Sequence, residues 1–278
     1  MSARLRGIAR QTEEIVAAGS YRAPDGREVL LAADIAAARA GTRLYGPEPV
    51  PVPSAPETVP PAPDAVFEVT GESSLEAARR LADAPVAVLN FASARNPGGG
   101  FLNGAQAQEE ALCRASALYT CVREAAAYYE HHRAHRDPFY TDRVIHSPAV
   151  PVFRDDRGAL LAEPYRAGFL TAAAPNAGVI RRTAPERTGE LPQALAVRAE
   201  RVLEVAAAHG YRRLVLGAWG CGVFQNDPAQ VAGAFRGLLG PGGRFAGTFE
   251  QVVFGVLDRT PGSVVREAFA EAFRTVGV

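Results

Sequence analysis

The sequence is poor in cysteine. Of its 278 residues only Cys113, Cys121 and Cys221 carry a thiol. No two of them form a Cys-x-x-Cys pair, and an odd, sparse set does not suit a disulfide framework. The simplest interpretation is a reducing compartment, so we expect a cytoplasmic protein.

An excess of positive charge is also lacking. Lys and Arg together number 30, as do Asp and Glu, so the formal net charge at pH 7 is zero. A protein that holds nucleic acid by its backbone is usually basic. The composition therefore gives no direct nucleic-acid signal, although a local basic pocket is compatible with it.

Long apolar runs are the third absence. No run approaches the roughly 18–20 residues that span a bilayer, and the start of the chain is not followed by the apolar core typical of a signal peptide. We therefore expect a soluble protein with no membrane partner. Hydrophobic residues make up 47% of the chain, a normal globular share, and the length suits one large domain or one domain with an appendage.

Proline divides the chain. Residues 4–18 carry apolar positions at helical spacing, and residues 34–40 predict a short Ala-rich helix. A Pro-dense passage over residues 46–63 then excludes a helix or a central strand, because proline lacks a backbone donor and fixes φ. We expect an N-terminal helical accessory region with a Pro-rich connection over 1–64, and a core over 65–278.

The core alternates strand and helix patterns, which predicts a three-layer α/β/α sandwich with a sheet that is at least partly parallel. The predicted strands cover residues 66–70, 86–91, 143–146, 168–174, 213–216 and 251–257. The predicted helices cover 73–82, 108–132, 191–209, a segment beginning near 227, and 264–273.

A glycine loop over 217–222 follows a predicted strand and precedes a helix that begins at Asp227 and Pro228. Glycines let successive backbone N–H groups turn towards one anion, so a phosphate or diphosphate would suit this loop; a tight turn is the plainer alternative. No Gly-Lys-Ser/Thr follows, and the dinucleotide fingerprint is absent, so neither a P-loop nor a Rossmann site is predicted.

A second glycine cluster follows the strand over 86–91. Gly98, Gly99 and Gly100 would let a ligand approach the backbone closely, and Glu109 and Glu110 follow at the start of a helix. Two adjacent glutamates at a helix N-terminus are usually solvated and stabilised by the helix dipole. Here a glycine loop at a strand end precedes them, and ligands bind at strand ends in open α/β folds.

This segment resembles the signature of the poly(ADP-ribose) glycohydrolases, which is a Gly-Gly-Gly, a short spacer and Gln-Glu-Glu. The residues that carry the resemblance are Pro97–Gly100 and Gln108–Glu110, and the flanking Leu89–Asn96, Ser147–Phe153 and Gly220–Phe224 look like the bacterial branch of that family. The resemblance implies a macrodomain with a mixed sheet, which binds ADP-ribose at the strand ends.

The resemblance also implies roles for individual residues. Glu110 would be the general acid and then the base that activates water, while Glu109 would hold the ribose hydroxyls. The substrate-binding candidates are Asn96 for the distal ribose, Gly98, Gly99 and Gly100 for close approach, Gly220, Cys221, Gly222 and Val223 for the diphosphate, and Phe224 for the terminal ribose. Gln108 would orient either ligand or loop, and Phe224 has the alternative of a core position at the loop exit.

The implied activity is hydrolysis of ribose–ribose O-glycosidic bonds in poly(ADP-ribose), mainly from polymer ends, with ADP-ribosylated proteins as partners. The alternatives are a hydrolase of single ADP-ribosyl units and a macrodomain that binds ADP-ribose without cleaving it. We expect no cofactor and no metal, since His131 and His135 lack an evident third ligand. Trp219 has two open interpretations, a stacking partner for adenine and a space-filling residue.

Overall fold

The computed structural model describes residues 2–52 and 65–274. Its strands are β1 (Ser20–Arg22), β2 (Glu28–Leu30), β3 (Arg43–Tyr45), β4 (Val66–Thr70), β5 (Val86–Phe91), β6 (Val144–Arg154), β7 (Leu160–Ala172), β8 (Arg213–Gly217) and β9 (Gln251–Gly255). Its α-helices are α1 (Ala3–Ala18), α2 (Ala32–Gly41), α3 (Ser74–Leu81), α4 (Gln108–Ala115), α5 (Leu118–Val122), α6 (Ala126–Ala134), α7 (Ala177–Thr183), α8 (Leu191–Ala208), α9 (Pro228–Leu239) and α10 (Val264–Phe273). Short 3₁₀ turns are η1 (Phe101–Asn103), η2 (Arg123–Ala125), η3 (Pro185–Glu190) and η4 (Pro261–Ser263).

A seven-stranded sheet in the order β3-β6-β7-β5-β8-β9-β4 forms the centre of the molecule. Strands β3, β6 and β7 pair antiparallel, and β7, β5, β8, β9 and β4 pair parallel. Strand β5 is buried over nearly its whole length, as its continuous apolar sequence predicts for a strand covered on both faces. The mixed sheet of the sequence prediction is confirmed.

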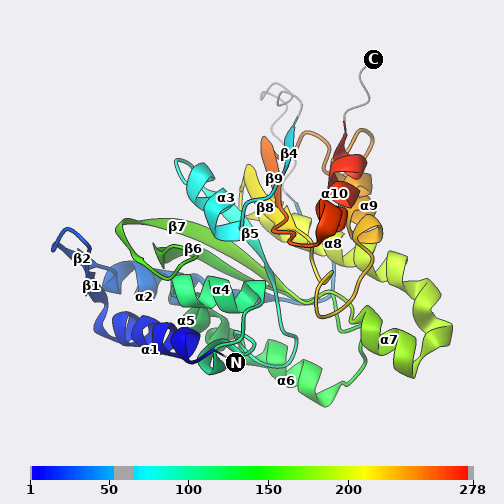
Figure 1. Cartoon of the computed structure of the whole chain (residues 1–278). Helices are drawn as coiled ribbons and strands as arrows, with labels where there is room; N and C mark the ends of the chain where they lie inside the picture. Colours follow the sequence, from blue (N-terminus) through cyan, green and yellow to red (C-terminus); the bar gives the residue numbers. More distant parts are fainter. Residues whose placement is uncertain (1, 53–64, 275–278) are drawn as a thin grey trace.

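Helices cover both faces of the sheet (Figure 1). One apolar core lies between the sheet and the first six helices, and it contains Leu112, Cys113 and Cys121. The second lies between the sheet and α8, α9 and α10. The three-layer α/β/α arrangement is therefore confirmed, and Cys113 and Cys121 are both buried.

The long helix predicted over 108–132 is wrong. The chain instead forms α4, α5, η2 and α6, because α4 ends where Ser116 takes an extended conformation with φ −144° and ψ 176°. The backbone of Ser116 forms a bridge with Val152 of β6, and its hydroxyl donates to the carbonyl of Leu112 and accepts from the N–H of Leu118. Tertiary pairing thus outweighs the helical propensity of the segment.

The strands predicted over 143–146 and 168–174 are parts of longer strands. Strand β6 continues through Pro148 and Pro151 to Arg154, and β7 already begins at Leu160. Beyond His146 no residue of β6 pairs with β3, and among the described residues this edge has only the bridge from Val152 to Ser116 and the hydrogen bond from the N–H of Ala117 to the carbonyl of Pro151. The register of β6 against β7 shifts between Ser147 and Val150. A bulged edge that no full strand covers tolerates the missing N–H groups of the two prolines.

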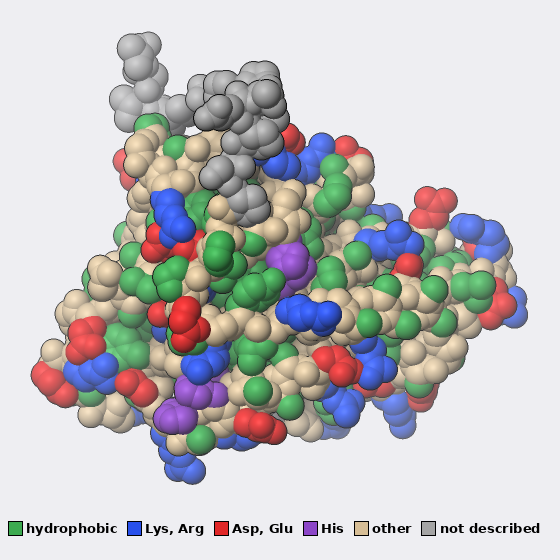
Figure 2. Space-filling view, turned by 180° about the vertical axis from the view of Figure 1, so that it is seen from behind, with side chains coloured by type: hydrophobic (Ala, Val, Ile, Leu, Met, Phe, Trp, Pro, Cys, Tyr) green, Lys and Arg blue, Asp and Glu red, His purple; other side chains and the backbone are tan. Residues whose placement is uncertain are grey.

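The N-terminal region forms α1, the β1–β2 hairpin, α2 and β3, and β3 is an edge strand of the central sheet. The boundary at residue 64 stays a prediction, and residues 53–64 of the Pro-dense passage lie outside the described residues. In the described part of the chain no helix is both long enough and apolar enough to cross a bilayer. Arginine and acidic side chains are interspersed on the face seen in Figure 2.

A buried carboxylate joins the N-terminal segment to the helix layer that contains α8, α9 and α10. Glu204 of α8 is fully buried and accepts the backbone N–H of Val50 at 2.9 Å. Arg201 and Arg244 form ion pairs with the same carboxylate. Removal of one partner from a buried ion pair leaves the others without compensation, which costs far more than loss of a surface pair.

We therefore expect Glu204→Gln to lower the free energy of unfolding by about 3 kcal/mol, because Arg201 is left buried without its counter-charge. The matched control is Glu200→Gln, which removes the more exposed partner of Arg244 and should cost less than about 1 kcal/mol. Urea unfolding of both variants measures the difference. If both variants lose the same free energy of unfolding, the buried ion pair contributes no more to stability than the exposed one.

Candidate active site

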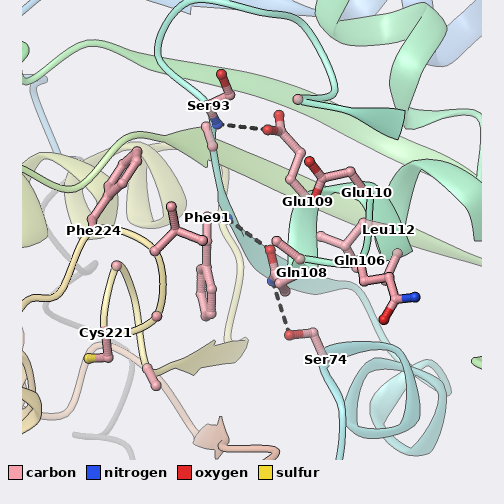
Figure 3. Close-up of a pocket in the computed structure, with 18 of the residues that line it drawn as sticks. Ser74, Phe91, Ser93, Gln106, Gln108, Glu109, Glu110, Leu112, Cys221 and Phe224 are labelled. Carbon is pink, nitrogen blue, oxygen red and sulfur yellow. Dashed lines mark hydrogen bonds between the residues drawn. The ribbon is translucent and has the colours of Figure 1, made fainter. Parts of the chain in front are cut away.

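A cavity of about 1190 Å³ lies at the carboxyl ends of the parallel strands. The two glycine loops that follow β5 and β8 line it, together with the start of α4 and the segment after β9. Figure 3 shows the carboxylates of α4 on one side of this cavity and the loop that carries Cys221 and Phe224 on the other. The sequence prediction that both glycine loops lie at strand ends is confirmed.

Gln108 joins the head of α4 to the strand beneath it. Its amide nitrogen donates to the carbonyl of Leu89 and to the hydroxyl of Ser74, and its amide oxygen accepts the N–H of Phe91 at 2.9 Å. Both N–H donors of the side chain are therefore used within the protein. Figure 3 shows the bonds of Gln108 with Phe91 and Ser74. Of the two alternatives for Gln108, the geometry favours the one in which it orients the loop.

Glu109 is buried, with 2% of its surface exposed. One carboxylate oxygen accepts the backbone N–H of Ser93 at 2.7 Å, and the other accepts the side-chain amide of Asn90 at 3.3 Å. Burial raises the pKa of Glu109 to about 8; the hydrogen bond from Ser93 opposes this rise, and the charge of Glu110 adds to it. The buried position of Glu109 therefore favours its protonated form.

Glu110 lies beside it, with 7% of its surface exposed, and lines the cavity. Its Oε1 accepts the backbone N–H of Gly100 at 2.8 Å. Its Oε2 has no hydrogen-bond partner among the described residues. A buried carboxyl oxygen without a partner is costly unless it has a function, because a lost hydrogen bond leaves the desolvation of that atom uncompensated.

Gly99 makes this arrangement possible. Its φ is 57°, and a Cβ atom at this position would lie 2.4 Å from Oε1 of Glu110. Only glycine lets the backbone pass so close to the carboxylate. Gly98 differs from its neighbours, because it is buried with its Cα facing the ring of Tyr119 and does not line the cavity. Its contact with substrate stays a prediction, and in this structure the turn at Gly98 packs on Tyr119.

The second glycine loop presents a row of backbone donors. Within the described part of the chain, the N–H groups of Gly222, Val223 and Phe224 donate to no protein acceptor. Asn226 fixes the loop by donating from its side-chain amide to the carbonyls of Pro175 and Gly220. Consecutive free N–H groups make an anion-binding concavity, so this loop can hold a phosphate or diphosphate.

Three side chains of this loop have distinct surroundings. Phe224 lines the cavity, and its ring centroid lies 5.8 Å from that of Tyr140. Burial raises the pKa of the Cys221 thiol to about 12, so it stays protonated and is no nucleophile. Trp219 is 1% exposed and donates from Nε1 to the carbonyl of Ala172 at 2.9 Å. The space-filling interpretation of Trp219 is confirmed, and adenine stacking is wrong.

The structure adds residues that the sequence analysis missed. Asn90 and Ser93 position Glu109, and the signal for Asn90 was a single amide inside an apolar strand. Tyr140 lines the cavity with φ 58° and follows no recognisable motif. Asn96 lies exposed at the rim of the cavity, as a contact with a ribose requires.

The comparisons with known proteins agree with this geometry. A family model described as the catalytic domain of the microbial-type PARG matches residues 9–155. A search of curated proteins finds no match. The crystal structure of poly(ADP-ribose) glycohydrolase from Thermomonospora curvata is 50% identical, with a TM-score of 0.91, and the alignment covers 98% of this chain and 100% of that one.

A second structure of the Thermomonospora curvata enzyme, bound to the inhibitor ADP-HPD, matches with 50% identity and a TM-score of 0.89 over 98% of this chain and 100% of that one. Poly(ADP-ribose) glycohydrolase from Deinococcus radiodurans, in complex with ADP-ribose, is 44% identical with a TM-score of 0.78, over 87% of this chain and 98% of that one. The signature, the cavity and these matches agree, and the chain belongs to the microbial-type poly(ADP-ribose) glycohydrolase family.

Proposed function

We propose that this protein hydrolyses the ribose–ribose O-glycosidic bonds of poly(ADP-ribose), releases ADP-ribose from polymer ends, and uses Glu110 for proton transfer. The observation that carries the residue assignment is that Glu110 lines a cavity between two glycine loops, while its Oε2 is buried without a hydrogen-bond partner among the described residues. ADP-ribosylated proteins are the partners that carry this substrate, and the sparse cysteines favour a cytoplasmic setting.

Glu110 would act in both steps of the reaction. Its carboxyl would protonate the leaving ribose oxygen while the anomeric carbon takes on oxocarbenium character. The resulting carboxylate would then accept a proton from the attacking water. The hydrogen bond from Gly100 would hold the side chain in one orientation through both steps.

Glu109 would bind the ribose hydroxyls. Because its carboxyl is held by Asn90 and Ser93, it is fixed before substrate arrives. A protonated Glu109 can donate as well as accept a hydrogen bond, which suits a ribose diol. It also leaves the neighbouring Glu110 beside a neutral group rather than beside a second charge.

The second loop would hold the diphosphate through the N–H groups of Gly222, Val223 and Phe224, assisted by Gly220 and Cys221. Phe224 would pack against the terminal ribose, and its contact with Tyr140 limits the positions of its ring. Asn96, Gly99 and Gly100 would border the distal ribose from the opposite loop. The amide of Gln108 would hold the start of α4 against the end of β5.

We expect Glu110→Gln to lower the turnover of labelled poly(ADP-ribose) by about 10³-fold or more, because an amide cannot transfer the proton. The dissociation constant of ADP-ribose should change less than about threefold, since the glutamine oxygen can still accept the N–H of Gly100. Single-turnover assays and calorimetry measure the two quantities. Glu163→Gln, on the exposed part of β7, is the matched control; retained cleavage in Glu110→Gln would disprove the assignment.

The raised pKa of Glu109 predicts that this side chain lowers the stability of the folded protein at high pH. The unfolded chain releases this proton near 4.5 and the folded protein near 8, so the folded state binds more protons over this interval and its stability falls as pH rises. We expect Glu109→Gln to be more stable than the unchanged protein at pH 9, by on the order of a few kcal/mol, and to differ less at pH 5.

Urea unfolding at the two pH values measures this difference, with Glu163→Gln as the control that should show no pH-dependent gain. The same Glu109→Gln variant should hydrolyse polymer more slowly, because its ribose contact changes. A stability difference that is the same at pH 5 and pH 9 would show that Glu109 does not ionise in this interval.

Substrate class is tested with two labelled substrates, automodified polymer and a protein that carries single ADP-ribosyl units. We expect ADP-ribose monomers from the polymer, with long chains shortened gradually, and little release from the singly modified protein. Loss of label from the second substrate alone would favour a mono-ADP-ribosyl hydrolase, and binding without release would favour a non-catalytic macrodomain. Gel analysis of chain length distinguishes release from the ends from internal cleavage.

A further inference from the structure

The turn that carries Gly99 and Gly100 runs on to Ala105, and we call residues 99–105 the glycine turn. In the described part of the chain, three polar contacts join it to other elements. The carboxylate of Glu110 accepts the N–H of Gly100, the backbone N–H of Ser2 donates to the carbonyl of Gly104, and the guanidinium of Arg114 donates to the carbonyl of Ala105. Arg114 is the one side-chain cation among them.

Arg114 lies four residues after Glu110 on α4, which places both side chains on the same face of the helix. Its Nη1 lies 2.5 Å from the carbonyl oxygen of Ala105. The N–H of Ala105 in turn donates to the carbonyl of Gly100 at 3.2 Å, and the N–H of Gly100 donates to Glu110. A continuous chain of hydrogen bonds therefore runs from Arg114 through the glycine turn to the carboxyl of Glu110.

The N-terminal helix fixes the other end of this chain. The hydroxyl of Thr12 in α1 donates to the backbone carbonyl of Arg114 at 2.7 Å, and it accepts from Nε of Arg154 at 3.1 Å. Arg154 also donates to the side chain of Gln11. Thr12 and Arg154 are buried, and α1 lies beside α4 in Figure 1. The accessory helix thus contacts the helix that carries both glutamates.

Arg114 forms no salt bridge with the described residues. No carboxylate of the described residues lies within 4.0 Å of it, and a small cavity that it shares with Asp155 and Asp156 lies between α1, α4 and the loop after β6. Burial lowers the pKa of Arg114 below its usual value, and the charge of Glu110 opposes this. A half-buried guanidinium remains charged, and among the described residues its one hydrogen bond goes to the carbonyl of Ala105.

We propose that Arg114 is a positioning residue for this reaction, which holds the glycine turn against the carboxyl of Glu110, and that α1 sets the place of Arg114 through Thr12. The proposal rests on the proposed function, because it takes Glu110 as the group that transfers the proton. Small displacements of a reacting group are costly, since a shift of about 1 Å can lower a rate by roughly 10²-fold.

The test compares Arg114→Gln with Arg114→Lys. We expect Arg114→Gln to lower kcat for poly(ADP-ribose) between about 10-fold and 100-fold, because the turn loses its hold on Glu110. The dissociation constant of ADP-ribose should change less than about threefold, since the diphosphate binds to the other loop. Arg114→Lys keeps a cationic donor and should recover about tenfold of the loss. Arg10→Gln, on the exposed face of α1, is the matched control and should leave kcat unchanged.

Hydrogen exchange separates positioning from general destabilisation. Amide protons of the glycine turn should exchange about tenfold faster in Arg114→Gln, while those of β5 keep their rate. Thr12→Val, which removes the hydroxyl that donates to the carbonyl of Arg114, should raise exchange in the same turn and also lower kcat. An Arg114→Gln protein that loses stability but keeps kcat and turn exchange would overturn the proposal, even where Glu110→Gln is inactive. Activity in Glu110→Gln would instead disprove the proposed function.

Discussion

The structure depends on the burial of two adjacent carboxyl groups at the head of one helix. Water solvates carboxylates well, so each oxygen removed from water needs a donor, a proton or a function. Glu109 accepts from Asn90 in β5 and from Ser93 just after it, and burial raises its pKa. Glu110 accepts from Gly100, and its other oxygen has no partner among the described residues. The shape of the loop before α4 follows from this need, because only a glycine at position 99 leaves room for the carboxylate.

Much of this fold is predictable from the sequence, because strands such as β5 are nearly continuous apolar runs and the helices α3 and α9 begin with side-chain caps. Ser73 and Glu76 form a capping box at α3, and Asp227 caps α9 before Pro228, as the sequence pattern indicates. The failures occur where distant segments decide local structure. Ser116 ends a helix because it forms a bridge with Val152 of β6, and β6 accommodates two prolines because no strand pairs along that edge beyond His146.

The candidate site divides along similar lines. Glu109, Glu110 and the two glycine loops are visible as a spaced motif, since backbone access and paired carboxyls need particular residue types. The roles of Gly98 and Gln108 depend on the partners that surround them, which spacing does not give. Tyr140 follows no motif, so only the folded chain shows that it lines the cavity. Arg114 looks like an ordinary helical arginine in the sequence, and only the fold brings the carbonyl of Ala105 next to it.

Trp219 is the one tryptophan of the chain, and it lies in a dry position directly before the loop of free N–H groups. Its indole is held by the carbonyl of Ala172 at the end of β7, and the neighbouring Phe235 ring lies 6.2 Å away between centroids. All indole emission therefore originates at a single site, between the sheet and the anion-binding loop. The intrinsic fluorescence of Trp219 therefore responds to changes in the loop that follows it, and ligand binding at that loop can be followed without a label.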